Sequence, residues 1–305
     1  MTAVVDAPAE QRTPLLRRRA RSTEEKVWGT VRVVTIVFLV LITVGPFWYM
    51  IVLSLRPIQQ VLLDPGRIWV AGGELTAGAY RAVFRSTDDG GQGFLVFLKN
   101  SGLIAVTSVI VTLVVSILGA YAISRLQFFG RRQVHFLFLA VYLFPAILLA
   151  IPLFVFFTRI GLRGSLFGLV LVYASQIVPV TIHMLRNYFE TVPESLEEAA
   201  ALDGASRLTI IRKVSLPLAM PAIMATSLFV FMIAWNEFLF ALLFLVENRD
   251  NWTVSLGLSQ LAGSVEVAKT TLMAGSVILT VPIIVLFFAT ERLLVEGLTS
   301  GGEKG

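Results

Sequence analysis

The sequence predicts an all-α integral membrane protein with six transmembrane helices, and three observations lead to this prediction. Hydrophobic residues make up 56% of the 305 residues and charged residues only 15%, whereas soluble domains contain about 45–50% and about 25%. Apolar stretches of about 20 residues, the length that crosses a bilayer core, recur along the chain. Lysine and arginine gather beside particular stretches, as they do at the cytoplasmic ends of membrane helices.

Six apolar stretches justify the predicted spans. They cover residues 33–55, 101–124, 134–157, 165–185, 218–246 and 272–290. The fifth stretch is the longest, so we expect it to tilt or to extend beyond the bilayer. Prolines inside these stretches predict kinks, because proline removes a backbone hydrogen bond from a helix. They are Pro145, Pro152, Pro179 and Pro282.

The positive charges predict which side of the membrane each loop faces. They are dense ahead of the first stretch and recur between the second and third and between the fourth and fifth. They are Arg12, Arg17, Arg18, Arg19, Arg21, Lys26 and Arg32, then Arg125, Arg131 and Arg132, then Arg186, Arg207, Arg212 and Lys213. Because such residues favour the cytoplasmic side, we expect both termini to be cytoplasmic. Arg159 and Arg163 lie on the other side and weaken the pattern.

The N-terminus is rich in Arg, Ala, Thr and Glu. We expect residues 1–28 to form a disordered, basic cytoplasmic arm that contacts anionic lipid. A cleaved signal peptide is the alternative, but the apolar run that follows is too long for one and no small-residue cleavage site follows it. Topology explains the arginines more simply than nucleic-acid binding does, so no nucleic-acid partner is expected.

Residues 186–217, between the fourth and fifth stretches, predict a helix–turn–helix on the cytoplasmic side. Thr191 and Glu194 fit a helix start, and the alanine- and glutamate-rich residues after them favour a helix. Gly204 should end this helix, because glycine accepts the left-handed conformation found at helix C-termini.

A second, amphipathic helix is expected over residues 206–214. It should bury Leu208, Ile211 and Val214, and Pro217 should end this helix and begin the fifth span. A solvated connector is the alternative for the whole segment. Three consecutive alanines beside a fixed glycine turn favour a surface on which another protein docks closely.

At this segment the sequence resembles a known family. Glu198-Ala199-Ala200, three residues, Gly204, nine residues and Val214-Ser215-Leu216-Pro217 match the EAA-x3-G-x9-I-x-LP signature, with valine in place of isoleucine. This signature is typical of permease subunits of binding-protein-dependent ABC importers. The Asn100-Ser101 pair, the Ala120–Arg132 region and Trp235-Asn236-Glu237-Phe238 resemble the carbohydrate-uptake branch, and the C-terminus is similar to that of the maltose-type G permease.

The resemblance implies a type I importer architecture with a permease domain over residues 29–297. It also implies that the helix–turn–helix couples to an ATPase. The residues that it assigns to coupling are Glu198, Ala199, Ala200, Asp203, Gly204, Val214, Leu216 and Pro217. Residues 298–305 are expected to be a cytoplasmic tail that docks on the ATPase. The tail residues assigned to docking are Thr299, Ser300, Gly301, Gly302 and Lys304.

The resemblance further implies the partners: a second, non-identical permease, two copies of an ABC ATPase and an extracytoplasmic solute-binding protein. The sequence contains no GxxxxGK[ST] phosphate-binding loop, so ATP and magnesium should bind to the partner subunits and this chain should bind no cofactor. With no cysteine and only two histidines, His135 and His183, no metal site is expected. No catalytic constellation is recognisable, so the chain is expected not to be an enzyme.

Polar residues inside the spans are candidates for a substrate path, because polar groups at that depth are costly. Asn236 and Glu237 are the strongest candidates, and Trp235 beside them could stack on a sugar ring. Gln176, near the middle of the fourth span, is a weaker candidate. The alternative for Asn236 and Glu237 is interhelical packing or contact with the second permease.

The function that the resemblance implies is import of a sugar, a di- or oligosaccharide, by an ATP-driven transporter. An ABC permease for another small solute, such as a polyol phosphate, is one alternative. A stand-alone secondary transporter is the other, and it would need no surface for an ATPase.

Overall fold

The computed structural model describes residues 23–264 and 267–300, and every regular element in these ranges is helical. The chain divides into two units, residues 1–48 and residues 49–305. The first unit contains most of α1 (Thr23–Ser54), whose apolar side chains are exposed. Because α1 begins at Thr23, residues 23–28 are helical, and the predicted disordered arm is wrong for them. Residues 1–22 lie outside the described residues.

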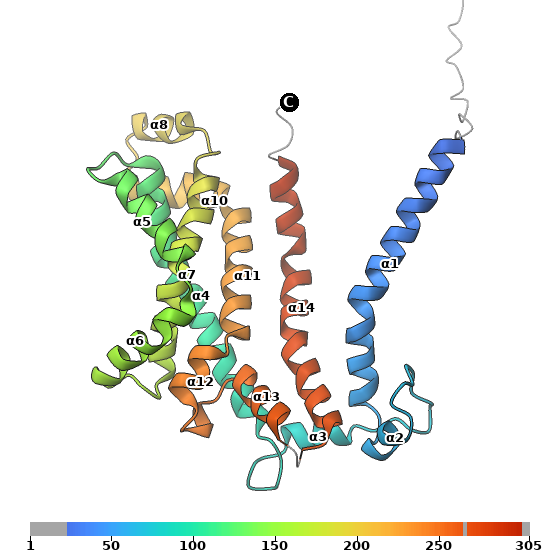
Figure 1. Cartoon of the computed structure of the whole chain (residues 1–305). Helices are drawn as coiled ribbons and strands as arrows, with labels where there is room; N and C mark the ends of the chain where they lie inside the picture. Colours follow the sequence, from blue (N-terminus) through green and yellow to red (C-terminus); the bar gives the residue numbers. More distant parts are fainter. Residues whose placement is uncertain (1–22, 265–266, 301–305) are drawn as a thin grey trace, which may run out of the picture. The chain divides into compact units, whose positions relative to one another are not determined.

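The second unit is built around α4 (Phe94–Arg125) and α7 (Leu166–Phe189), which pack side by side along their length (Figure 1). α11 (Met220–Asn236) packs against both, and α14 (Lys269–Ser300) packs on α11. Small polar side chains line the α4–α7 contact, where the hydroxyls of Ser116 and Thr181 are 2.5 Å apart. Such side chains let membrane helices approach closely and bond to each other.

Length and composition agree with the predicted spans, although two of the spans are bent. α1, α4, α7 and α14 are each long and apolar enough to cross a membrane. Two further helix pairs qualify only when each bent pair is taken as one span. The predicted second, fourth and sixth stretches therefore correspond to α4, α7 and α14, with ends that differ by several residues.

The third stretch bends sharply at Pro145, one of the predicted kink sites. It forms α5 (Arg131–Leu143) and α6 (Ala146–Arg159), which meet at 97°. Pro145 causes the break: proline restricts the preceding residue to an extended backbone, and Phe144 has φ −76° and ψ 128°. The other three predicted kink sites, Pro152, Pro179 and Pro282, lie inside continuous helices.

The fifth stretch also differs from its prediction. Residues Arg207–Leu218 form one helical run, which meets α11 at 77°. Pro217 therefore ends the segment before the bend and does not begin the fifth span. α11 stops at Asn236, and α12 (Leu239–Leu245) starts after a two-residue break.

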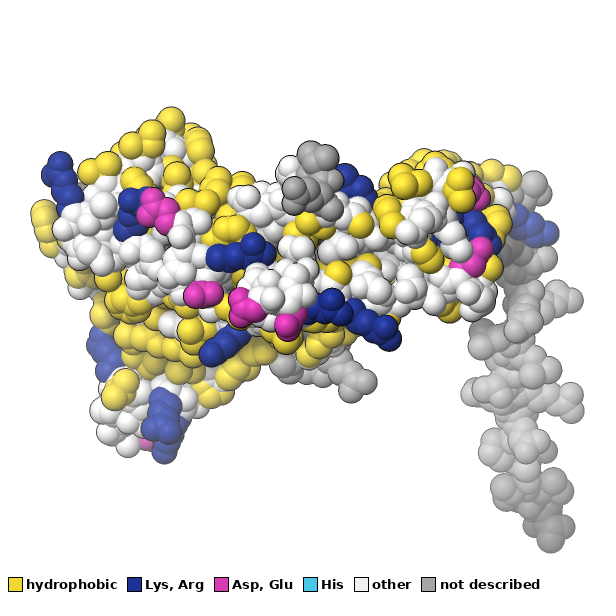
Figure 2. All heavy atoms as spheres, turned by 90° about the horizontal axis from the view of Figure 1, so that it is seen from below, with side chains coloured by type: hydrophobic (Ala, Val, Ile, Leu, Met, Phe, Trp, Pro, Cys, Tyr) yellow, Lys and Arg dark blue, Asp and Glu magenta, His cyan; other side chains and the backbone are white. Residues whose placement is uncertain are grey.

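The end of this unit opposite the helix–turn–helix carries short elements: α2 (Ile58–Leu63), α3 (Gly78–Phe84), the 3-10 turn η2 (Arg249–Asn251) and α13 (Val254–Gly263). Figure 2 shows this face, on which charged side chains of both signs lie between hydrophobic ones. Arg56 is buried beneath the α2 loop and donates hydrogen bonds to three backbone carbonyls, those of Gln60, Asp64 and Arg67. These bonds fix the loop after α1.

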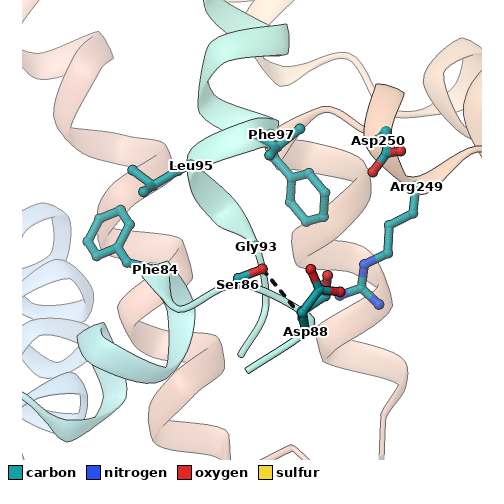
Figure 3. A pocket seen from close by; sticks show the side chains of 10 residues that line it. Phe84, Ser86, Asp88, Gly93, Leu95, Phe97, Arg249 and Asp250 are labelled. Atoms are coloured by element: carbon teal, nitrogen blue, oxygen red, sulfur yellow. Dashed lines mark hydrogen bonds between the residues drawn. The ribbon is translucent and has the colours of Figure 1, made fainter. Parts of the chain in front are cut away.

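A cavity of about 500 Å³ lies at the same end, between the loop before α4 and η2 (Figure 3). Phe97 forms part of its wall, and the Arg249 guanidinium lies 5.9 Å from the centroid of that ring and 5.2 Å from that of Trp252. Asp88 and Asp250 also line it, so the cavity combines aromatic surface with charges of both signs.

Candidate functional site

The helix–turn–helix contains α8 (Glu194–Leu202), α9 (Arg207–Ile210), the π-helical turn η1 (Ile211–Ser215) and α10 (Leu216–Leu218). α8 follows Pro193, whose backbone is extended, and Thr191 bonds to the carbonyl of Tyr188. The expected capping of α8 by Thr191 is therefore wrong. The run of alanine and glutamate still explains why α8 is helical, because both have high helix propensity.

Gly204 ends α8 as predicted. Its φ is +81°, and its N–H donates to the Ala201 carbonyl at 3.0 Å. The N–H of Ala205 donates to the Ala200 carbonyl, also at 3.0 Å. This pair of bonds is the Schellman arrangement, which turns the chain sharply and satisfies carbonyls at the helix end.

The second helical piece buries a different face from the one expected. Ile210 is buried, whereas Leu208 is 71% exposed; Ile211 and Val214 are half-buried. The π-helical turn Ile211–Ser215 comes after both Leu208 and Ile210, and its wider turn rotates only the residues that follow Ile210 relative to a regular α-helix. The rotation brings Ser215 into the protein, where it is fully buried.

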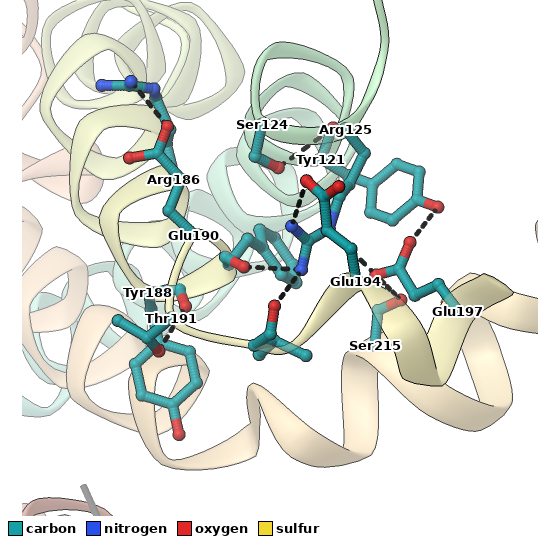
Figure 4. A network of polar contacts seen from close by, with 12 residues as sticks. Tyr121, Ser124, Arg125, Arg186, Tyr188, Glu190, Thr191, Glu194, Glu197 and Ser215 are labelled. Carbon is teal, nitrogen blue, oxygen red and sulfur yellow. Dashed lines mark hydrogen bonds and ion pairs between the residues drawn. The ribbon is translucent and has the colours of Figure 1, made fainter. Parts of the chain in front are cut away.

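Glu197 connects three parts of the structure (Figure 4). Its Oε1 accepts hydrogen bonds from Arg125 Nε at 3.1 Å and from Ser215 Oγ at 2.9 Å, and its Oε2 accepts one from Tyr121 Oη at 3.0 Å. Tyr121 and Arg125 belong to the end of α4, and Ser215 to η1. One carboxylate therefore joins both arms of the helix–turn–helix to a core helix.

Arg125 completes this network, which we call the Glu197 network and which consists of Tyr121, Arg125, Glu197 and Ser215. The Arg125 side chain is 6% exposed. Its Nη2 donates to the carbonyls of Phe189 and Val192 at 2.8 and 2.6 Å, beside the end of α7. The segment is thereby anchored both to α4 and to the end of α7. A loose solvated connector would lack these contacts.

The predicted coupling residues lie around this network. Glu198, Ala199, Asp203 and Gly204 are exposed along the outer side of α8 and its turn, and Ala200 is half-buried. Leu202, at the end of α8, is 90% exposed. The signature residues after α9 are less accessible: Val214 and Leu216 are half-buried, whereas Pro217 is exposed.

Sequence reasoning did not assign the Glu197 network to the site. Glu197 precedes the signature glutamate, but helical spacing places it on the side of α8 that faces α4. The one available signal was position: Arg125 ends a predicted span, and Ser215 lies inside the signature. Sequence alone does not indicate that they meet.

The four substrate-path candidates do not form one polar cluster. Trp235 is buried, donates through Nε1 to the Leu279 carbonyl at 2.9 Å and stacks on Phe231. Asn236 is exposed and donates to the Met232 carbonyl. Gln176 is half-buried on α7. The indole of Trp235 is thus committed to packing, and Asn236 and Gln176 stay candidates for the path.

Glu237 connects elements within the chain. Its carboxylate accepts hydrogen bonds from the N–H groups of Phe240 and Ala241 at 2.8 and 3.1 Å, so it caps the start of α12. Tyr173 on α7 donates to the same carboxylate at 2.5 Å. Ser255 on α13 donates to the Glu237 carbonyl at 2.6 Å. These contacts are those that the packing alternative predicts.

The predicted tail is only partly described. α14 continues through Ser300, so Thr299 and Ser300 are helical and the expected boundary between residues 297 and 298 is not a helix end. Gly301, Gly302 and Lys304 lie outside the described residues. Docking of the tail on an ATPase stays a prediction.

Comparison with known proteins identifies the family. The model of the binding-protein-dependent transport system inner membrane component matches residues 113–299, more than half of the chain. The chain belongs to this family. It is therefore a multi-pass membrane component of a transport system, a permease and not an enzyme, as the sequence predicted.

Individual relatives agree with this family. The trehalose/maltose transport system permease protein MalG of Thermococcus litoralis is 34% identical over 92% of this chain and 99% of its own length. The trehalose transport system permease protein SugB of Mycobacterium tuberculosis is 34% identical over 85% of this chain and 92% of its own. A bacterial ABC transporter involved in import of the acidic polysaccharide alginate has a chain that matches with TM-score 0.76 and 25% identity, over 90% of this chain and 98% of that one. The type I importer permease fold is thereby established.

Proposed function

We propose that this permease translocates a sugar, a di- or oligosaccharide, into the cytoplasm as part of an ATP-driven ABC importer. The names of the two relatives, which are trehalose and maltose transport components, support the substrate class. The alginate importer with the same fold supports a saccharide as well. A permease for another small solute, such as a polyol phosphate, is the second candidate, because the description of the family names no solute.

The proposed coupling depends on the Glu197 network. A nucleotide-binding subunit grips the exposed side of α8, including Leu202, and closes when it binds ATP. The network carries that movement to α4 and the end of α7, and the spans exchange inward-open and outward-open states. ATP and magnesium remain on the partner, and this chain binds no cofactor.

The proposed assembly contains a second, non-identical permease and two copies of the ATPase. Both termini and the helix–turn–helix face the cytoplasm, as the arginine distribution predicts. The opposite end, with its aromatic and charged cavity, receives the solute-binding protein.

Reconstituted uptake tests this function. The complete complex in proteoliposomes should accumulate labelled sugar when ATP and magnesium are inside with the ATPase and the loaded binding protein is outside. Vesicles that contain this chain alone should accumulate none. Uptake by the chain alone would establish a self-sufficient carrier, and uptake of a polyol phosphate in preference to every sugar of a panel would establish the second candidate.

A further inference from the structure

A groove runs between α5 and α7, which lie side by side (Figure 1). Its volume is about 350 Å³, and its lining is almost entirely apolar. The lining side chains include Leu137, Phe138 and Val141 from α5 and Ala174, Val178 and Pro179 from α7. A groove of this kind between two membrane helices can bind a hydrocarbon chain, but it has too few polar groups to bind the hydroxyls of a sugar.

The two histidines of the chain lie beyond one end of this groove. His135 lies three residues before Phe138, and His183 four residues after Pro179, so each is one helical turn from a lining residue. The two rings stack with centroids 5.6 Å apart and planes at 21°. The pair lies toward the start of α5 and the end of α7, which is the end that carries the helix–turn–helix.

The polar atoms around this histidine pair are short of acceptors. Arg186 Nη1 lies 3.1 Å from His135 Nε2, and Asn187 Nδ2 lies 3.3 Å from His183 Nε2. Guanidinium and amide nitrogens only donate, so both Nε2 atoms accept and the ring protons reside on the two Nδ1 atoms. Those Nδ1 atoms and Arg186 Nε are buried without a partner. The two Nδ1–H groups and the Arg186 Nε–H therefore form a cluster of three donors without an acceptor.

The charge at this end of the groove is positive. Arg131 and Arg132 occupy the first turn of α5, where the helix dipole adds to their field, and Arg186 lies beside His135 near the end of α7. Arg131 also donates to the Ser124 carbonyl at 3.0 Å. Glu190 is paired with Arg186 at 2.6 Å and offsets one of these three charges. A ligand that complements the region has a hydrocarbon chain, a negative charge and oxygens that only accept.

We infer that the α5–α7 groove is a binding site for an anionic phospholipid of the leaflet on the helix–turn–helix side. One acyl chain lies along Phe138 and Val178, and the phosphate lies against the arginines and the histidine pair. Buried unpaired donors are costly, and a turn of the two rings toward the headgroup would let a phosphate oxygen relieve that cost. This inference does not depend on the proposed sugar transport, because it follows from the residues of α5 and α7 alone.

Photolabelling of the complete purified complex tests this site. The probe is a phosphatidylglycerol with a photoreactive acyl chain in phosphatidylcholine nanodiscs, and peptide mass spectrometry locates the label. We expect label on α5 and α7. Val178→Trp fills the groove and should remove most of it, whereas Ile151→Trp, a change of the same kind at an exposed position of α6, should not.

Substitutions that remove a positive charge test whether the lipid headgroup binds at the predicted end of the groove. Arg132→Gln should lower labelling about fivefold, the effect of about 1 kcal/mol for a basic residue near the membrane surface. Arg159→Gln, at the far end of α6, should leave labelling unchanged. Equal labelling by a phosphatidylcholine probe, displacement by inorganic phosphate, or a groove that crosslinks only to the second permease would overturn the proposal.

Discussion

Glu197→Gln is expected to uncouple ATP hydrolysis from transport. Arg125 is 6% exposed and Glu197 11%, so the substitution leaves a buried guanidinium without its principal counter-charge. Breaking such a buried pair costs about 3–5 kcal/mol. That cost falls on the contact between α8 and α4, so uptake per ATP hydrolysed should fall roughly tenfold or more, since about 1.4 kcal/mol already corresponds to tenfold. Uptake and ATPase rates measured on the same proteoliposomes give the ratio.

Glu194 provides a matched control for this substitution. It contacts the same Arg125, at 3.2 Å, but its side chain is 70% exposed. Exposed ion pairs contribute about 0–1 kcal/mol, so Glu194→Gln should change the uptake ratio little. If the two variants behave alike, the Glu197 network does not transmit the movement.

Gly204→Val should insert into the membrane normally and lose coupled uptake. The φ of Gly204 is +81°, and a side chain in this region costs about 1–2 kcal/mol, with β-branched residues the least tolerated. Within this chain nothing lies within 4 Å of the position that a Cβ would take, so the cost inside the subunit is strain in the turn. We expect roughly tenfold lower uptake, with the complex still recovered by affinity purification.

Two further variants distinguish a specific role of the Gly204 turn from a general effect of backbone strain. Asparagine tolerates the left-handed region, so Gly204→Asn should retain most of the uptake. Gly161 has φ +74° and an equally open surrounding but lies in the loop between α6 and α7, so Gly161→Val applies the same strain outside the helix–turn–helix. Uncoupling by Gly161→Val to the same degree would show that Gly204 has no special role.

The sequence predicts the features that depend on neighbours along the chain. Apolar runs of sufficient length locate the membrane helices, because a bilayer core requires about 20 apolar residues in a row. Gly204 predicts the end of α8, because its lack of a Cβ acts within a single turn. The family signature is of the same kind, since its spacing is short.

Bends are less predictable. Pro145 breaks a helix, whereas Pro152, Pro179 and Pro282 do not, because surrounding helices decide whether a freed carbonyl is tolerated. The break after Asn236 contains neither glycine nor proline. The break is stabilised by the Glu237 cap and by the hydrogen bond from Tyr173 on α7. No local sequence pattern predicts the contact between Tyr173 and Glu237.

Contacts between distant positions account for the remaining differences. Arg125 and Glu197 are 72 positions apart, and their bond exists because α4 and α8 meet. The π-helical turn changes which residues after Ile210 are buried, and it brings Ser215 into the protein. Sequence spacing assumes a regular α-helix and cannot anticipate the extra residue in that turn.

Site-specific crosslinking from α8 tests the central claim most directly. The chain has no cysteine, so Leu202→Cys introduces a single thiol at a 90% exposed position. In the intact complex, a short bifunctional reagent should join this thiol to the nucleotide-binding subunit, and ATP should change the yield. Ser195→Cys, also exposed on α8, gives a second attachment point. Efficient crosslinking of neither position to a nucleotide-hydrolysing subunit would contradict the account.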